Sequence, residues 1–150
     1  MSSNLSDLPL HALSAGIAAR RFSPVDVVEA CLARIAALEP KLRAFVAVYD
    51  NDARLAAEAA DKAIRAGHGL GPLHGLPIAL KDLIEIEGRV TTGGSAVWRE
   101  RVSRHTATLA KKVIAAGMIV LGKTHTVEFA YGASGTNQHM GTPWNPWDLE

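Results

Sequence analysis

The chain has 150 residues, of which 48% are hydrophobic and 21% charged, so it is long and apolar enough for one globular domain with its own core. Sixteen basic and fifteen acidic residues leave a formal charge of +1, which argues against a nucleic-acid-binding surface and against an acidic tail. The single cysteine, Cys31, excludes a disulfide framework and a thiolate zinc cluster.

The N-terminal segment carries no recognisable targeting signal. Its first ten residues, MSSNLSDLPL, lack the basic start and the long apolar stretch of a signal peptide. No apolar run approaches the length that spans a membrane. We therefore expect a cytoplasmic protein that acts on small molecules, without a nucleic-acid or membrane partner.

The first third of the chain has the residue spacing of helices. Ser23, Pro24 and Asp26 make a capping-box-like start for a helix that Pro40 should end. One face of this helix is apolar and is expected to face the core: Val25, Val28, Cys31, Ile35 and Leu38. Cys31 is therefore interpreted as a core thiol rather than a catalytic one.

A short strand and a second helix follow. Residues 44–49, AFVAVY, predict the strand, and an alanine-rich segment from about 52 to 66 predicts the helix, which Gly67 should close. Two pairs in this segment, Glu58 with Lys62 and Asp61 with Arg65, have the i,i+4 spacing that is typical of a solvated helix face.

From residue 67 onward, glycines and prolines separate short apolar runs. The segment GHGLGPLHGLPIALKD predicts a loop that leads into a buried strand from Pro77 to Leu80, and this strand should stop at Lys81. A helical pattern that begins at Thr108 ends at Gly117, and the run Met118 to Leu121 predicts another buried strand. The alternation of helix and strand signals indicates an α/β layer architecture.

Residues 117–124, GMIVLGKT, match the spacing of a phosphate-binding loop. In such a loop a strand precedes the first glycine and a helix follows the lysine. Here the order is reversed, because a helical pattern comes first and the four intervening residues are uniformly apolar. We therefore favour a structural role for this segment over a nucleotide site.

Lys81 occupies the position that most favours chemistry. If its strand carries it inward, desolvation would favour the neutral amine, which can act as a general base. The alternatives are that Lys81 reaches the solvent or pairs with its neighbour Asp82.

The other candidates have weaker patterns. Ser95 and Ser134 miss the nucleophile-elbow spacing and are interpreted as turn residues. Glu128 fits a paired structural carboxylate better than an acid catalyst. The six histidines lack the i,i+4 pairing of a metal site, so no metal is predicted.

Four segments, in order, resemble the N-terminal part of the amidase signature family: GPLHGLPIALKD, TTGGS, AAGMIVLGKTHTVEFAYG and TNQHMGTPWNPWD. The resemblance implies an α/β fold with a mixed β-sheet core covered by α-helices. Residues 1–150 would be the N-terminal part of a single catalytic domain, with about 1–66 mainly helical and about 67–150 starting the α/β core. Enzymes of this family hydrolyse or transfer amide groups with a serine nucleophile, a second serine in a cis peptide conformation and a lysine. Lys81 matches that lysine.

The resemblance also implies what this stretch of sequence leaves out. Both family serines would follow the NPWD segment and so lie beyond Glu150, which would leave residues 1–150 inactive alone. We expect hydrolysis of a small carboxamide or related C–N bond through an acyl-enzyme, without a cofactor or metal. The loop residues Ser134, Gly135 and Thr136 are expected to border the substrate, and a homodimer is left open.

Two positions depart from the family pattern, and they bear on the choice of substrate. Thr106 stands where many relatives carry aspartate, and His125 stands where asparagine is usual. The segment GKTHTVEFAYGAS differs from the GKTNMDEFAMGSS typical of the amidotransferase enzymes of this family, which act on misacylated tRNA. A stand-alone amide hydrolase is therefore favoured over an amidotransferase component, and a non-catalytic interaction module is the alternative from a different class.

Overall fold

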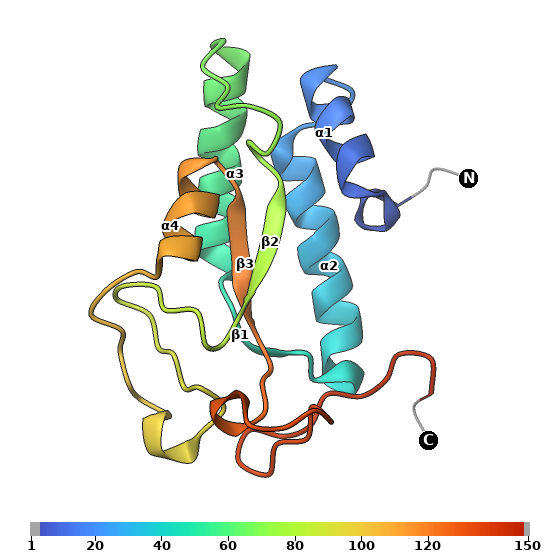
Figure 1. The fold of residues 1–150 in the computed structure, drawn as a ribbon. Coiled ribbons are helices and arrows are strands. Elements are labelled where there is room, and N and C mark those ends of the chain that lie inside the picture. The colour runs from blue at the N-terminus through green and yellow to red at the C-terminus, as the bar shows by residue number, and fades with distance from the viewer. Residues whose placement is uncertain (1–3, 149–150) are drawn as a thin grey trace. The chain divides into compact units, whose positions relative to one another are not determined.

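The computed structural model describes residues 4–148. Its helices and strands are, in chain order, α1 (Leu10–Ala18), α2 (Pro24–Leu42), β1 (Phe45–Val48), α3 (Asp50–Arg65), β2 (Pro77–Lys81), α4 (Thr108–Ala115) and β3 (Ile119–Thr124) (Figure 1). Three short 3-10 helices cover Leu5–Asp7, Ala96–Trp98 and Glu128–Ala130.

The chain divides into two compact units, and α2, β2, α4 and β3 each pass from one unit to the other. Of the described residues, unit 1 comprises 4–37, Tyr49–Ile78 and Val113–Leu121. Unit 2 comprises Leu38–Val48, Ala79–Lys112 and 122–148.

The start of α2 is fixed by the predicted capping box. The Asp26 main-chain N–H donates to Ser23 Oγ at 3.1 Å, and the Ser23 N–H donates back to Asp26 Oδ2 at 2.8 Å. Two main-chain donors that the first helical turn would otherwise leave unpaired are thereby satisfied. The prediction for this end of the helix is confirmed.

The prediction that α2 ends at Pro40 is wrong, since the helix continues to Leu42. The chain leaves the helix at Arg43, whose φ of 50° is left-handed. The Glu39 carboxylate then accepts hydrogen bonds from the N–H groups of Ala44, at 3.2 Å, and Phe45, at 2.9 Å. Because these bonds occupy the donors that follow the helix, the carboxylate and not the proline fixes its end.

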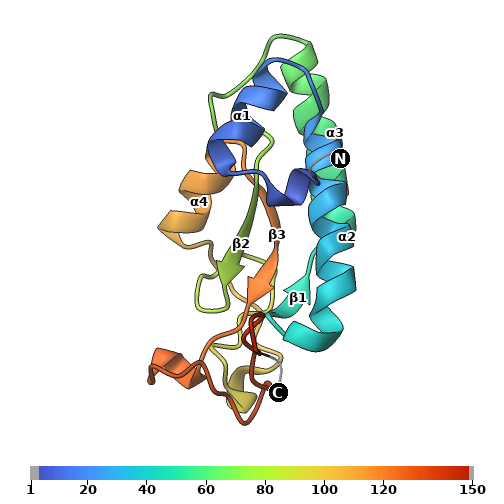
Figure 2. The same cartoon turned by 90° about the vertical axis from the view of Figure 1, so that its right-hand side faces the viewer.

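The core of unit 1 consists of two apolar clusters. In the first, α2 and α3 pack against β3 through buried residues: Val28, Leu32, Ala53, Ala57, Ala60, Ile119 and Leu121. The small alanines allow α2 and α3 to pack closely, and Figure 2 shows both helices on the same side of the strands. The second cluster joins α1 to α2 and to the loop before β2: Leu13, Ile17, Val27 and Leu76. Cys31 packs against both clusters, which confirms its interpretation as a core thiol.

The strands of residues 4–148 form one three-stranded sheet in the order β1-β3-β2. β1 is antiparallel to β3, with Ala47 opposite Lys123. On the other side of β3, Ile119 N donates to Leu76 O and Asp82 N donates to Thr124 O, each at 2.9 Å. These bonds advance in the same direction along both strands, so β2 and β3 are parallel. The sheet is therefore mixed, as expected.

The GMIVLGKT segment forms the end of a helix, a turn and a strand. Gly117 follows α4 with a φ of 83°, a conformation that favours glycine. Gly122 lies where β3 meets β1, and a Cβ there would be 2.2 Å from Ala47 O. Both glycines of the phosphate-loop pattern thus have structural causes, and the helix-before-strand order confirms our interpretation.

Candidate active site

Lys81 is the last residue of β2 and lines a hollow of about 160 Å³ in unit 2. The same hollow is lined by His125 and by Gly132, Ala133 and Gly135 of the glycine-rich loop that follows β3. The structure therefore brings Lys81 together with Gly135, one of the three loop residues expected near the substrate.

The burial of Lys81 that we considered from the sequence is not found, because Lys81 is exposed. Side chains alternate between the two sides of a strand, and this alternation buries Leu80 and Asp82 at 2% and 1% exposure. Lys81 between them faces the opposite side. In residues 4–148, Lys81 therefore reaches the solvent, which was one of the two alternatives. The other alternative, a pair between Lys81 and Asp82, is not found, because the Asp82 carboxylate pairs with Lys123.

Ser134 and Thr136 line a second hollow in unit 2, of about 490 Å³. Their hydroxyl oxygens are 2.9 Å apart and both side chains are exposed. Val127 and Gly132 line both this hollow and the one that contains Lys81, so the two are neighbours. Of the three loop residues predicted for the substrate site, Gly135 lines the same hollow as Lys81. Ser134 and Thr136 line the neighbouring hollow.

Glu128, at the edge of the larger hollow, is a paired carboxylate, as expected. Ser95 Oγ donates to Glu128 Oε1 at 2.6 Å, and His139 Nε2 lies 3.3 Å from Glu128 Oε2. The bond from Ser95 lowers the pKa of Glu128, and His139 adds to this effect. Ser95 Oγ also accepts from Val97 N at 3.3 Å at the start of a 3-10 helix, which confirms its role in a turn.

The lysine that the structure buries is Lys123, which sequence reasoning did not identify as a buried charge. Its side chain is 1% exposed and its Nζ donates to Ile84 O at 2.6 Å and to Thr91 Oγ1 at 2.9 Å. Asp82 Oδ1 lies 3.5 Å from the same nitrogen. Burial lowers the pKa of Lys123, while the charge of Asp82 opposes that shift. The sequence signal for this ion pair is that Asp82 and Lys123 each stand just after a strand-like apolar run.

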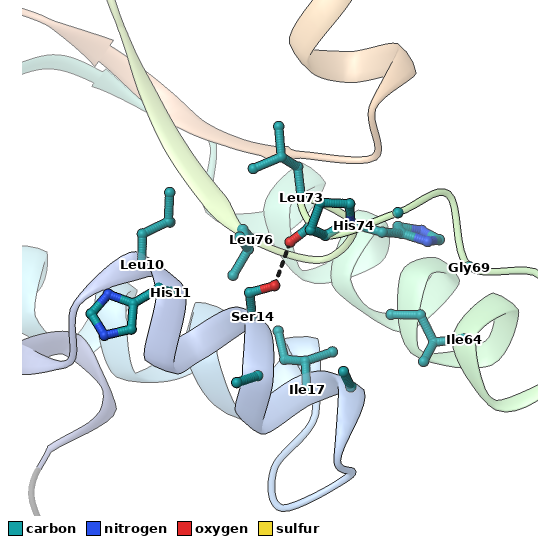
Figure 3. A pocket seen from close by; sticks show the side chains of 13 residues that line it. Leu10, His11, Ser14, Ile17, Ile64, Gly69, Leu73, His74 and Leu76 are labelled. Atoms are coloured by element: carbon teal, nitrogen blue, oxygen red, sulfur yellow. Dashed lines mark hydrogen bonds between the residues drawn. The ribbon is translucent and has the colours of Figure 1, made fainter.

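Unit 1 contains a hollow of about 660 Å³ between α1 and the loop before β2 (Figure 3). Its lining is mainly apolar, with Leu10, Ile17 and Leu73 among the side chains drawn. Ser14 Oγ donates to Pro72 O at 2.7 Å, and His74 Nδ1 accepts from Leu70 N at 3.1 Å. Ser14 and His74 thus already serve the fold, and none of the residues predicted for the substrate site lines this hollow.

Residues 4–148 show neither a metal-binding cluster nor a membrane-spanning helix. Within this range no three His, Cys, Asp or Glu side chains gather as a metal site would require. None of the helices described there combines the length and the apolar character needed to cross a bilayer.

Comparison with known proteins identifies the family. The model of the family described as Amidase matches residues 26–150. The chain belongs to the amidase family. Its fold is that of solved amidases, since the peptide amidase from Stenotrophomonas maltophilia superposes with a TM-score of 0.87 at 32% identity, over 96% of this chain and 31% of that one. The resemblance and the fold class inferred from the sequence are confirmed.

Curated relatives of this amidase-family chain include the A subunits of glutamyl-tRNA(Gln) amidotransferases. The one from Acidothermus cellulolyticus is 44% identical over 137 residues, which cover 91% of this chain and 27% of the relative. The one from Chloroflexus aurantiacus is 42% identical over 144 residues, which cover 96% and 30%. The chain therefore spans less than a third of the length of these relatives.

A solved structure concerned with a vestigial protein complex and the origins of an s-triazine catabolic enzyme is also similar. It matches with a TM-score of 0.90 and 38% identity, over 95% of this chain and 31% of that one. The amidase-family fold of this chain is therefore shared by proteins whose names refer to different reactions.

The structure gives a partner to each of the two residues that depart from the amidase-family pattern. Thr106 Oγ1 accepts from Glu87 N at 3.0 Å. His125 Nε2 lies 3.0 Å from Met140 O, and because a carbonyl only accepts, Nε2 carries the proton. Both contacts lie within unit 2.

Proposed function

We propose that this chain supplies the general base, Lys81, of an amidase that cleaves a small carboxamide or related C–N bond. The observation that carries the proposal is the shared hollow that Lys81 and Gly135 line in a chain of the amidase family. A base at the end of a strand, facing a loop of small residues, leaves room for an amide carbonyl beside it.

The proposed reaction begins with proton transfer to the neutral Lys81 amine from a serine hydroxyl, which in turn accepts the proton of a second, nucleophilic serine. The nucleophilic oxygen forms a bond to the amide carbonyl, the C–N bond breaks, and the amine leaves with the returned proton. Water then hydrolyses the acyl-enzyme. By resemblance, both serines are expected beyond Glu150, and no cofactor takes part.

The exposure of Lys81 places a condition on this proposal. A lysine is a base only when its amine is neutral, and desolvation favours that form. In the complete protein we therefore expect residues outside this chain to cover Lys81. The assignment of residues 1–150 to a single catalytic domain and the cytoplasmic location remain predictions alongside it, and a homodimer stays open.

Replacement of the proposed base tests the function directly. In the complete protein, Lys81→Ala should lower the acylation rate by about 10²-fold or more, which is the scale of general base catalysis. Release of 4-nitroaniline from 4-nitroacetanilide measures the rate. Lys111→Ala is the matched control, because Lys111 is an exposed lysine on α4 that lines neither of the two hollows beside Lys81. Equal rates for Lys81→Ala and Lys111→Ala would refute the proposal.

A second candidate is the amidotransferase reaction, which the 44% identity to a component of a glutamyl-tRNA(Gln) amidotransferase favours. In that case Lys81 would serve the release of nitrogen from an amide donor, and the nitrogen would pass to glutamyl-tRNA(Gln) with the help of further subunits. The two candidates separate in one assay. The complete protein alone should hydrolyse 4-nitroacetanilide if it is a stand-alone hydrolase, whereas an amidotransferase component should form Gln-tRNA(Gln) only with its partner subunits.

A further inference from the structure

The main chain just after Lys81 is held from two sides. Asp82 N donates to Thr124 O of β3 at 2.9 Å, and Asp82 O accepts from Gly93 N at 3.0 Å. The peptide that follows the proposed base is therefore fixed both to the sheet and to the TTGGS turn.

The side chain of Asp82 is also held from two sides. Its Oδ2 accepts from Thr92 N at 3.1 Å and from Thr92 Oγ1 at 2.5 Å, while its Oδ1 faces Lys123 Nζ at 3.5 Å. Both carboxylate oxygens thus have partners, and none of these partners is Lys81. A carboxylate next to the proposed base in sequence is directed away from it.

Lys123 connects to Lys81 through the turn that follows β2. Ile84 N donates to Lys81 O at 2.9 Å, which closes the turn from Lys81 to Ile84. The carbonyl of Ile84 accepts from Lys123 Nζ at 2.6 Å. Lys123 therefore holds the turn whose first residue is Lys81, and the turn cannot rotate without breaking a bond to a buried ammonium.

The cost of burying the ion pair of Lys123 and Asp82 indicates that the pair does more than stabilise the fold. A buried ion pair loses the hydration of both charges, and apolar residues of similar volume often stabilise a core at least as well. Lys123 and Asp82 are 0% and 1% exposed, so both charges bear that cost. What an apolar pair would not provide is a donor aimed at Ile84 O and an acceptor aimed at Thr92 N.

We propose that Lys123 and Asp82 are positioning residues for catalysis, which set the backbone of Lys81 and thereby the direction of its amine. The inference rests on the proposed role of Lys81 as the base. A base displaced by about 1 Å from its productive position can lose about 10²-fold in rate without any change in its chemistry. Lys123 and Asp82 touch no substrate in this scheme and act only through Lys81.

The test is a double-mutant cycle in the complete protein, with 4-nitroacetanilide as the probe. Lys123→Met keeps the length of the side chain and removes the donor. It should lower kcat about tenfold or more while KM changes by less than about threefold. Combined with Lys81→Ala, it should cause no further loss, because a residue that acts through Lys81 has nothing left to position. Lys111→Met is the control for replacement of an exposed lysine.

A second variant removes the unpaired charge that Lys123→Met leaves at Asp82. In Lys123→Met/Asp82→Asn the amide oxygen can still accept from Thr92, so folding should be kept while the loss of kcat remains. A folded double variant with wild-type kcat would overturn the inference, and so would losses that multiply when Lys123→Met is added to Lys81→Ala. Failure of both Lys123→Met and Lys123→Met/Asp82→Asn to fold would also overturn it, since the pair would then serve the whole fold. Full activity of Lys81→Ala would instead refute the proposed function itself.

Discussion

Ser95 and Glu128, 33 positions apart in sequence, are joined by a hydrogen bond of 2.6 Å from the serine hydroxyl to the carboxylate. The bond ties the TTGGS turn to the segment that leads into the Ser134 loop. Since Ser95 is wholly buried and Glu128 is half-buried, the serine presents a fixed donor to a carboxylate at the rim of the hollow.

Removal of this donor should change the titration of Glu128. The bond holds the pKa of Glu128 in the folded protein below its ordinary value. The bond therefore stabilises the fold fully at a pH above the pKa that Glu128 has in the unfolded chain. This stabilisation is lost as the pH falls through the pKa that Glu128 has in the folded protein. In Ser95→Ala the pKa should rise toward the ordinary range, as side-chain NMR titration would show. The difference in melting temperature between wild type and variant should be largest at neutral pH and shrink in acid. A difference independent of pH, or an equal effect of Ser134→Ala, would contradict this view.

The capping box of α2 makes a quantitative prediction about stability. Ser23→Ala removes the acceptor for the Asp26 N–H and should cost about 1 kcal/mol in the free energy of unfolding. Ser23→Thr keeps a hydroxyl at the same position and is the matched control. Urea denaturation of the complete protein measures both, and equal stabilities for the two variants would show that the cap does not contribute.

Gly122 is required by the close approach of β1 to β3. A Cβ at this position would lie 2.2 Å from Ala47 O, a main-chain atom that cannot move without disturbing the strand pair. Gly122→Ala should therefore destabilise the protein by about 1–3 kcal/mol. Gly69→Ala is the control, because no atom apart from those of its chain neighbours lies within 4 Å of the added Cβ, and it should change stability by less than about 0.5 kcal/mol. Similar unfolding curves for the two variants would show that the strands tolerate the added methyl group.

The position of Ser134 in the loop expected to border the substrate leads to a prediction about substrate size. If Ser134 borders the substrate, Ser134→Leu in the complete protein should raise KM or change the preferred length of the acyl chain without impairing folding, because the added bulk occupies substrate space. The control is Ala66→Leu, which adds bulk at an exposed position that lines neither the hollow of Lys81 nor the neighbouring hollow of Ser134. Kinetics measured on 4-nitroanilides of increasing acyl length decide the matter. Unchanged kinetics on every substrate would remove Ser134 from the site.

A test with chelators examines the expectation that no metal takes part. In the complete protein, hydrolysis of 4-nitroacetanilide should be unchanged after treatment with EDTA, because proton transfer through Lys81 requires no Lewis acid. A loss of activity that added zinc restores would count against the proposed chemistry.

Features that depend on a few neighbouring residues could be predicted from the sequence. The capping box at Ser23 and the helix end at Gly117 are formed within three or four residues, so local patterns suffice. Glu58, Lys62 and Arg65 are exposed, as expected for a solvated helix face, and Arg65 also pairs with Asp61 at 2.9 Å. The end of α2 was missed because the bonds that fix it come from Glu39 to residues five and six positions later, a contact that no helix-ending signal describes.

The environment of the two lysines at strand ends was decided only by the tertiary structure. Lys81 and Lys123 both follow apolar runs, and their local sequences do not tell which one is buried. Lys123 is buried because partners 32 and 39 positions earlier in the chain, Thr91 and Ile84, present acceptors to its ammonium group. Lys81 is exposed because strand alternation turns it away from the side that buries Leu80 and Asp82. A charge can be buried only where its partners converge, and that convergence is a property of the folded chain.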